Sequence, residues 1–418
     1  MFNSNHRDNL LAIINSLVFL TGMLGYLIIM SPAMAEPGVN NGTIRIGSTQ
    51  PLKSDIQFIA EGMKNGMEAA LKNQKVKGQS IELVVLNDFY EPSTTVKAAK
   101  ELIEGGIFLM LGSTGSSTAK AVLPVLAESK VPAVGFYNGA GFTEPGDILN
   151  FRAPYSHEVE TIVEAVLAAG VKPAEICAYV QNDAFGMAGL KGVRVALEKQ
   201  PETSALVATL DQIIAIGGDN PKRNNIGPVG VHQRETLSVN EGYLSLKAWE
   251  KKSGTPCRFV VTVLTAQPAI QFISYAAALK REKWIFSIAS PAADQTFIDG
   301  FNQQNVKNKV IATSVTPLAD SGLPIVKEAQ KALGPNFNLV SLEGYMVGKM
   351  FLTIANNIQG ELTRANFLAA ARAHPYDLGG MMIDYTKDNQ GSDFVQLMSL
   401  QDGEFKAVGA SELSKLFQ

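Results

Sequence analysis

From Thr43 onward, short apolar runs alternate with segments in which apolar residues recur every three or four positions. The run at 44–47 precedes a helical stripe that includes Met63, Met67 and Leu71, and the same succession repeats along the chain. Neighbouring parallel strands need a long crossover connection, which is usually a helix. The alternation therefore predicts an α/β fold in which mostly parallel sheets are covered by helices on both faces.

The apolar runs place the expected strands at residues 44–47, 81–86, 107–111, 131–135, 176–180, 205–210, 259–264, 284–288 and 310–315, and at 381–385, 394–400 and 405–408 near the end. The alternation of strand and helix starts afresh after 151–155, which suggests that the chain crosses into a second lobe there. A second crossing, back to the first lobe, is expected at 316–317. We therefore expect two lobes joined by three crossings of the chain. The first lobe would contain residues 43–154 and 318–378, and the second lobe residues 155–317 and 379–418.

The first 35 residues have the pattern of an export signal. Arg7 precedes an apolar run from Leu10 to Met30, and Ala33-Met34-Ala35 supplies the small residues of a cleavage site. We expect cleavage after Ala35 and export of the mature chain. Because the apolar run is longer than a usual signal core, an uncleaved membrane anchor is the alternative.

The charge balance gives no reason to expect a nucleic acid or an anionic membrane surface as a partner. The chain has 36 Lys and Arg residues against 39 Asp and Glu residues, a net charge of −3. The expected signal carries one charge of each sign, Arg7 and Asp8, so its removal does not change this value.

Cys177 and Cys257 are the only cysteines, and each begins an apolar run. Two interpretations stay open, a disulfide between neighbouring strands, which export permits, or two buried thiols. No cluster of Cys or His has the spacing of metal ligands, and no cofactor motif occurs. We expect neither a metal site nor a cofactor.

A turn rich in hydroxyl groups follows the apolar run 107–111. Residues 112–118 read Gly-Ser-Thr-Gly-Ser-Ser-Thr, and a helix is expected from about 118 to 129. The start of a helix offers unpaired N–H groups and a partial positive charge, which suit a carboxylate or a phosphate. The alternative is that Ser116 or Ser117 is only the N-cap of that helix.

Catalysis is not expected, because no nucleophile elbow, phosphate-binding loop or His-Glu-x-x-His motif occurs, and acidic residues are scattered. Hydroxyls, an amide and aromatics at the carboxyl ends of strands describe a binding protein instead. The polar stretch 217–242 shows little periodicity and is expected to be either a functional loop or a surface insertion.

Several segments, in this order, resemble those of the periplasmic leucine/isoleucine/valine-binding proteins, the type I substrate-binding proteins of ABC importers. They are 111–119 (Leu-Gly-Ser-Thr-Gly-Ser-Ser-Thr-Ala), 131–135 with 138–140, 151–155 (Phe-Arg-Ala-Pro-Tyr), 181–186 (Gln-Asn-Asp-Ala-Phe-Gly) and 341–345 (Ser-Leu-Glu-Gly-Tyr). The likeness covers about 43–408. It implies a two-lobe fold, three hinge strands and a periplasmic location.

The resemblance also implies a ligand site between the lobes. The residues at the matching positions are Ser116, Ser117, Thr118, Asn138, Gly139 (through its backbone), Tyr155 and Phe185. Phe185 would close over the ligand from the second lobe, and ordinary core packing is the alternative. The chain departs from its relatives in three places, since 264–266 lacks their tyrosine, 287–294 lacks a glutamate for an ammonium group, and the loop 217–242 is longer than in the plain amino-acid binders.

The implied function is that of an exported monomer that clamps a small amino acid, branched-chain or apolar, or a related carboxylate, and delivers it to a membrane permease. The alternatives are a ligand-sensing module for a membrane receptor and a binder of amides or aromatic acids. An enzyme is not expected.

Overall fold

A computed structural model describes residues 36–418 except 219–220, 235, 305 and 307–308. The expected export signal, with its cleavage site and the alternative of a membrane anchor, lies outside the described residues. Within them, no helix has the length and apolar character needed to cross a membrane.

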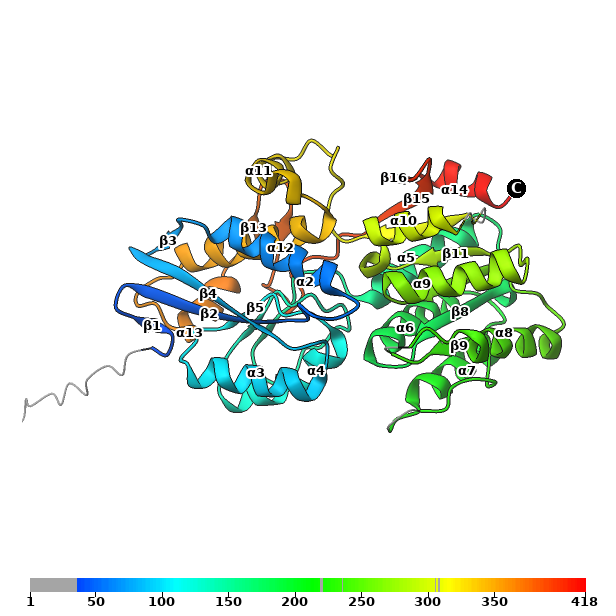
Figure 1. Ribbon diagram of the computed structural model, residues 1–418, viewed down its shortest axis with the longest axis horizontal. Helices are drawn as coiled ribbons and strands as arrows, with labels where there is room; N and C mark the ends of the chain where they lie inside the picture. The colour runs from blue at the N-terminus through cyan, green and yellow to red at the C-terminus, as the bar shows by residue number, and fades with distance from the viewer. Residues whose placement is uncertain (1–35, 219–220, 235, 305, 307–308) are drawn as a thin grey trace, which may run out of the picture. The chain divides into compact units, whose positions relative to one another are not determined.

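The first sheet has the strand order β3-β4-β2-β5-β6-β7, with β1 paired to β2. Figure 1 labels β1 to β5 of this sheet. Its strands are β1 (Val39–Asn40), β2 (Thr43–Gln50), β3 (Lys75–Val76), β4 (Gln79–Asn87), β5 (Met110–Leu111), β6 (Ala133–Val134) and β7 (Ile148–Leu149). The strands β4, β2, β5, β6 and β7 are parallel to one another. This sheet and the helices packed on it are called the first lobe.

Two apolar cores cover the faces of the first sheet. One joins the sheet to α2 (Gln57–Leu71), α11 (Pro324–Leu333), α12 (Leu339–Asn356) and α13 (Arg364–Ala371), and the other joins it to α3 (Pro92–Glu104) and α4 (Ser116–Glu128). Ile44 and Ile46 face the first core, whereas Ile107 and Met110 face the second. The helices α11 to α13 return to this lobe from the distant end of the sequence.

The second sheet has the order β16-β15-β12-β11-β10-β8-β9. Its parallel strands are β8 (Ile176–Gln181), β9 (Val229–His232), β10 (Phe259–Val263), β11 (Ile285–Ile288) and β12 (Val310–Ser314), and an antiparallel hairpin of β15 (Gln396–Gln401) and β16 (Glu404–Ala407) extends it. Its helices are α5 (Tyr155–Ala168), α6 (Ala184–Glu198), α7 (Ser204–Ala215), α8 (Asn240–Ser253), α9 (Ala266–Ser274), α10 (Gln295–Gln303) and α14 (Ala410–Leu416). These elements are called the second lobe.

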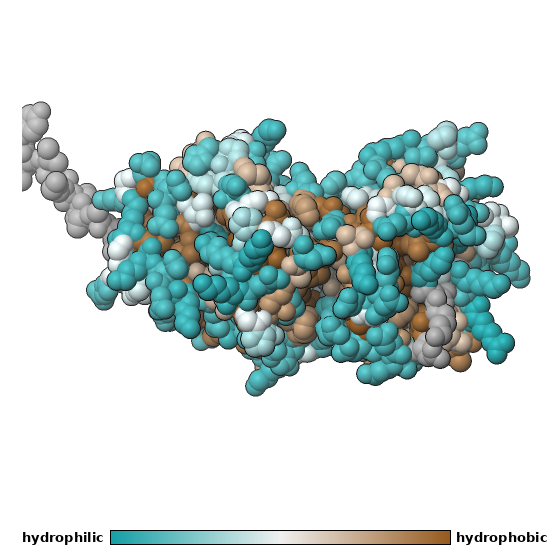
Figure 2. Space-filling view, turned by 90° about the horizontal axis from the view of Figure 1, so that it is seen from above, coloured by the Kyte–Doolittle hydropathy of each residue, from teal (hydrophilic) through white to brown (hydrophobic). Residues whose placement is uncertain are grey.

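The observed arrangement confirms the predicted α/β class with two mostly parallel sheets flanked by helices. A separate two-stranded pair, β13 (Tyr376–Asp377) with β14 (Met382–Ile383), packs in the core of the first lobe. On the surface shown in Figure 2, hydrophilic residues dominate, and hydrophobic residues are visible mainly in recesses between them.

One predicted strand is wrong, because residues 205–210 lie inside helix α7. The buried residues of α7 are Val207, Leu210 and Ile213, which recur every three positions and pack in a core of the second lobe. A short apolar run does not distinguish a strand from a buried helical turn. The stretch 217–242, expected to be a loop, contains the edge strand β9 and the first residues of α8.

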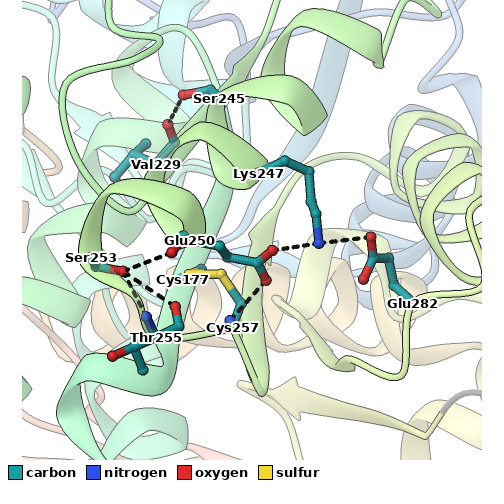
Figure 3. Close-up of a disulfide and its surroundings, with 9 residues drawn as sticks. All are labelled: Cys177, Val229, Ser245, Lys247, Glu250, Ser253, Thr255, Cys257 and Glu282. Atoms are coloured by element: carbon teal, nitrogen blue, oxygen red, sulfur yellow. Dashed lines mark hydrogen bonds and ion pairs between the residues drawn. A yellow bond between two sulfur atoms is a disulfide. The ribbon is translucent and has the colours of Figure 1, made fainter.

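Cys177 and Cys257 form a disulfide, with their Cα atoms 5.7 Å apart (Figure 3). Cys177 lies in β8 and Cys257 just before β10, and these two strands are parallel neighbours. Around the bridge, Glu250 Oε1 accepts a 2.9 Å hydrogen bond from the N–H of Cys257. Of the two interpretations left open by the sequence, the structure has the disulfide.

Candidate functional site

The helix α4 starts at Ser116, and its N-cap is Gly115, which has a φ of 109° and no side chain with which to cap the helix. The interpretation of Ser116 or Ser117 as the N-cap is therefore wrong. The first amide bonded within the helix is that of Ala119, which donates to the carbonyl of Gly115 at 3.1 Å. The N–H groups of the three preceding residues have no acceptor in the helix and are available to an anion.

Glycine is needed at position 115 for two reasons. Its φ lies in a region that disfavours residues with a Cβ. A Cβ there would also lie 2.5 Å from Thr118 Oγ1 and 2.7 Å from a ring carbon of Tyr90. The ring of Tyr90, which is buried, thus packs directly on the turn before α4.

The three predicted hydroxyl residues at the start of α4, Ser116, Ser117 and Thr118, differ in their hydrogen bonds. Thr118 Oγ1 donates to the carbonyl of Thr114 at 2.8 Å, and Ser117 Oγ donates to Asp183 Oδ2 at 2.6 Å. Ser116 is buried and makes no side-chain hydrogen bond to any residue that the structure describes. Ser116 is therefore the hydroxyl of this turn that is best placed to bind an external group.

The next loop supplies Asn138 and Gly139. Asn138 Oδ1 accepts a 2.9 Å bond from the N–H of Ala140, and the carbonyl of Gly139 accepts a 2.7 Å bond from the N–H of Tyr155. A Cβ at Gly139 would lie 2.7 Å from the ring of Tyr155. The absence of a side chain at 139 is what allows the start of α5 to approach this loop.

Tyr155 and Phe185 are in contact, with ring centroids 4.6 Å apart. Both are buried, and both belong to the core of the second lobe that includes β8 and α6. Phe185 therefore packs in this core and also faces Tyr155 at the crossing between the lobes, and its closing over a ligand stays a prediction.

The structure brings all seven predicted residues into one neighbourhood at the carboxyl ends of strands. Asp183 links them, because it bonds to Ser117 of α4 and, as the N-cap of α6, accepts from the N–H of Phe185 at 3.0 Å. Arg234, which follows β9 of the second lobe, makes a second connection to the first lobe. It donates to the carbonyl of Tyr90 and, at 3.2 Å, to Glu91 Oε2. The role of the seven residues in ligand binding stays a prediction.

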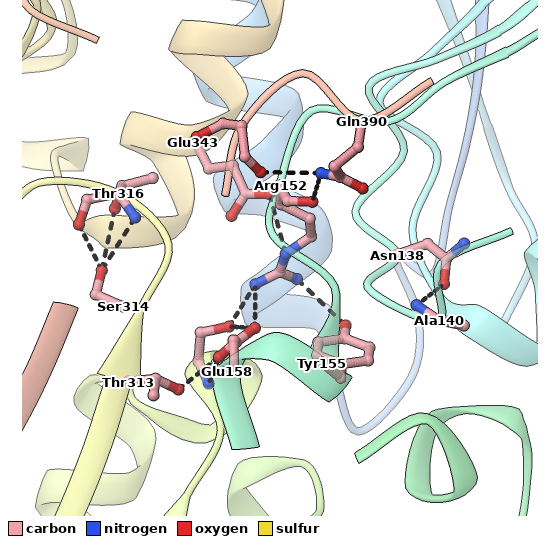
Figure 4. Close-up of polar contacts among 12 residues, drawn as sticks. Asn138, Ala140, Arg152, Tyr155, Glu158, Thr313, Ser314, Thr316, Glu343 and Gln390 are labelled. Atoms are coloured by element: carbon pink, nitrogen blue, oxygen red, sulfur yellow. Dashed lines mark hydrogen bonds and ion pairs between the residues drawn. The ribbon is translucent and has the colours of Figure 1, made fainter. Parts of the chain in front are cut away.

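Sequence reasoning missed Arg152, which lies next to the site and is 1% exposed (Figure 4). Its guanidinium donates to Ser290 Oγ and, at 3.2 Å, to Tyr155 Oη, and its Cζ lies 4.1 Å from the ring centroid of Tyr137. Two carboxylates flank it, Glu158 Oε1 at 3.8 Å and Glu343 Oε1 at 3.4 Å. An arginine within the apolar stretch Phe-Arg-Ala-Pro was the one signal in the sequence.

Burial controls the electrostatics of this cluster. It raises the pKa of Glu343 to about 7, against the lowering effect of Arg152 and with a further rise from Glu158. Burial likewise raises the pKa of Tyr155 to about 12, so that its hydroxyl stays protonated. Beside the cluster lies a cavity of about 10 Å³ lined by Tyr137, Ser290, Glu343 and the hydroxyl residues of 313–316. That volume suits about one water molecule.

A larger pocket of about 580 Å³ opens between the lobes. Its lining comes from both, namely Ser54, Asp55, Phe89, Glu91, Thr236, Leu237 and Gln267. Phe89 and Leu237 are among the exposed large hydrophobic residues. No group of three or more His, Cys, Asp or Glu suited to a metal ion occurs in the part of the chain that the structure describes.

Residues 43–208 match the periplasmic binding protein family. A similar solved structure is a possible leucine/isoleucine/valine-binding protein from Rhodopirellula baltica SH 1, with 25% identity, a TM-score of 0.75, and coverage of 89% of this chain and 97% of that one. No curated protein matches this chain in sequence.

Two further structures share the fold. A branched-chain amino acid ABC transporter protein from Thermus thermophilus with bound valine has 15% identity, a TM-score of 0.68, and coverage of 89% and 96% of the two chains. A solute-binding protein from R. palustris in complex with 4-hydroxybenzoate has 18% identity, a TM-score of 0.68, and coverage of 88% and 96%. Together these matches confirm the resemblance to the leucine/isoleucine/valine-binding proteins, and the chain has the fold of the type I periplasmic binding proteins.

Proposed function

We propose that this protein is an exported, monomeric solute-binding protein that clamps a small carboxylate between its two lobes and delivers it to an ABC permease. The ligand class is an amino acid with a branched-chain or apolar side chain, or a related carboxylate. The observation that carries the proposal is the uncapped start of α4 beside Ser116, a hydroxyl without a described partner, with Asp183 and Phe185 of the other lobe close by.

The chemistry of the helix start favours an anion. Three backbone N–H groups precede the first intrahelical bond, and the helix dipole adds partial positive charge at the same point. A carboxylate there would accept charge-assisted bonds, which are stronger than neutral ones. The apolar remainder of the ligand would lie against Tyr155 and Phe185, whose ring centroids are 4.6 Å apart.

The division into lobes stays a proposal, with one boundary revised. Met381, Ile383 and Tyr385 belong to the core of the first lobe. We therefore put the third crossing after Tyr385 rather than near Gly379. The first crossing, before Tyr155, and the second, at 316–317, are kept. The periplasmic location and cleavage after Ala35 belong to the same proposal and are tested by sequencing the N-terminus of the secreted chain.

Aromatic acids are a second candidate ligand class. Tyr90 packs on Gly115, Tyr155 on Gly139, and Phe185 on Tyr155, so aromatic rings surround the start of α4. Rings of this kind stack on a planar ligand as well as they pack on an aliphatic one. The R. palustris neighbour was solved with 4-hydroxybenzoate.

A thermal-shift screen tests both classes. The ligands are L-leucine, L-valine and 4-hydroxybenzoate, and each is paired with the matching compound in which an amide replaces the carboxylate. A ligand at about 100 times its dissociation constant adds roughly 2.7 kcal/mol to the free energy of unfolding. We expect a shift with at least one carboxylate and none with its amide. Equal shifts with the amides would contradict the anion site.

Two separate measurements test whether the protein changes its ligand chemically and which membrane protein is its partner. A bound ligand should be recovered unchanged after saturation, because no catalytic role is proposed. Stimulation of a co-reconstituted permease by the loaded protein would support transport, whereas a response only from a membrane receptor would support the sensing alternative. Sedimentation of the mature chain tests the monomer.

A further inference from the structure

Arg152 lies between one acidic residue from each lobe. It follows β7 of the first sheet and precedes α5, which carries Glu158 and packs in the second lobe. Glu343 belongs to α12 of the first lobe. The ion-pair distances are 3.8 Å to Glu158 and 3.4 Å to Glu343, and the three side chains are no more than 4% exposed.

The cluster holds more acid than base. The charged groups that face Glu343 are Arg152 and Glu158, and the nearby titratable groups are the hydroxyls of Tyr137 and Tyr155. From the second lobe, Ser290 and Thr313 add only hydroxyls. On the opposite side of α12, helix α2 presents Gly62 and Met63, and Glu328 of α11 pairs with Lys349 instead. One guanidinium therefore faces two buried carboxyl groups.

The two carboxyl groups differ in their hydrogen bonds. Glu158 accepts from the N–H of Ser290 at 3.0 Å, from Ser290 Oγ at 2.9 Å and from Thr313 Oγ1, so its oxygens have three donors. Glu343 Oε1 has no hydrogen-bond donor among the described residues, although Arg152 Nε is within ion-pair distance. Glu343 is thus the group that a proton would neutralise at least cost.

We propose that Glu343 is a proton-binding site and that closing of the two lobes takes up a proton there. Arg152 acts as the positioning residue, because it holds the acidic groups of both lobes against each other. Opening of the lobes about the crossings between them would shift Ser290 and Glu158, which belong to the second lobe, relative to Glu343 and would admit water to it. This inference rests on the clamp motion of the proposed function.

The direction of the pH effect follows from the raised pKa of Glu343, which is about 7 against an ordinary value of 4.5. A group whose pKa is higher in the closed form favours that form at low pH. The advantage is complete below the ordinary value and is lost as the pH rises through about 7. Across that interval, ligand affinity should fall by up to about tenfold per pH unit.

Carbon-13 NMR of the unliganded protein, labelled at glutamate carboxyl carbons, tests the proton site directly. We expect one resonance with a midpoint near 7 that is missing from Glu343→Gln and present in the matched control Glu328→Gln. If the resonance lost in Glu343→Gln titrates below about pH 5, the proposal is overturned. Should Glu343→Gln fail to fold, a wild-type spectrum without any glutamate midpoint near 7 would overturn it equally.

Small-angle scattering tests the coupling. The wild type should be more compact at about pH 5.5 than at about pH 8.5, and Glu343→Gln should have the same radius at both. An identical pH profile in the two proteins would refute the coupling. The ligand proposal fails separately, because titration and compaction are measured without ligand and the thermal-shift screen is done at a single pH.

Discussion

Ser117 Oγ donates a 2.6 Å hydrogen bond to Asp183 Oδ2 and thereby joins the first turn of α4 to the residue that caps α6. Asp183 is held in place by its own lobe, since Oδ1 accepts from the N–H groups of Phe185 and Gly186 and Oδ2 accepts from Gln181 Nε2. This hydrogen bond, called the clasp below, therefore joins a carboxyl group fixed in the second lobe to the first turn of α4, where we propose the anion site.

Replacing Ser117 by alanine should open the unliganded protein. The variant loses one charge-assisted bond between the lobes, and its free energy of unfolding should change by no more than about 1 to 2 kcal/mol. Small-angle scattering should show a larger radius than that of the wild type. Ser129→Ala, at the other end of α4, is the control and should keep the wild-type radius. An unchanged radius in Ser117→Ala would show that the clasp does not hold the lobes.

Ser116 and Thr118 should respond differently to alanine. Ser116→Ala removes a hydroxyl without a described partner, so its melting temperature should stay the same while ligand affinity falls by roughly tenfold or more. Thr118→Ala breaks the bond to the carbonyl of Thr114, which should cost about 1 kcal/mol of stability. Calorimetric titration with the best carboxylate from the screen, and a melt of each variant, test this. Unchanged affinity in Ser116→Ala would rule out its hydroxyl as a ligand contact.

Gly115→Ala should destabilise the protein more than Gly170→Ala. Both positions have positive φ, at 109° and 93°, so an alanine at either position costs free energy through a strained backbone conformation. Only at 115 would the new Cβ clash, since nothing lies within 4 Å of a Cβ at 170. We expect about 1 kcal/mol for Gly170→Ala and a further 1 to 3 kcal/mol, roughly, for Gly115→Ala. Urea unfolding measures both, and equal losses would mean that the turn relaxes freely.

Asp88 should make stability depend on pH. Burial raises its pKa from 3.8 to about 6, although Tyr90 N–H and Thr95 Oγ1 donate to it. A raised pKa gives stability that is present below 3.8 and is lost as the pH rises through about 6. Between about pH 4 and pH 8, the wild type should lose roughly 2 to 3 kcal/mol more than Asp88→Asn. Urea unfolding at both values tests this, with the exposed Asp147→Asn as control. Parallel pH profiles for Asp88→Asn and the wild type would contradict it.

Reduction of the Cys177–Cys257 disulfide should lower the free energy of unfolding by roughly 4 kcal/mol, since the bridge closes a long loop in the unfolded chain. The two cysteines are 80 positions apart. Melts with and without reductant should differ for the wild type. The Cys177→Ala/Cys257→Ala variant should melt at the lower temperature under both conditions. If the melting temperature of the wild type were the same with and without reductant, the disulfide would contribute little to stability.

The sequence alone determined the class of fold and the position of the hydroxyl turn. Apolar runs and helical stripes report the periods of strands and helices, which depend on local side-chain spacing. The same local rule failed at 205–210, because this run contains only two of the three buried positions of α7, Val207 and Leu210, and is too short to show their helical period. It also did not identify Gly115 as the N-cap and offered Ser116 or Ser117 only as an alternative, because the choice of Gly115 depends on a backbone angle and on the nearby ring of Tyr90.

Only the tertiary structure decided which charged residues are buried and which residues form their ion pairs and hydrogen bonds. Arg152, Glu158, Ser290 and Glu343 are spread over almost two hundred positions of the chain and meet where it crosses between the sheets. Burial of a charge costs free energy unless its partners are in place, and those partners come from segments that no local pattern links. The pairing of Cys177 with Cys257 likewise requires β8 and β10 to be neighbours. They are neighbours in the sheet although β9 lies between them in the sequence, so the order of strands along the chain does not predict this pairing.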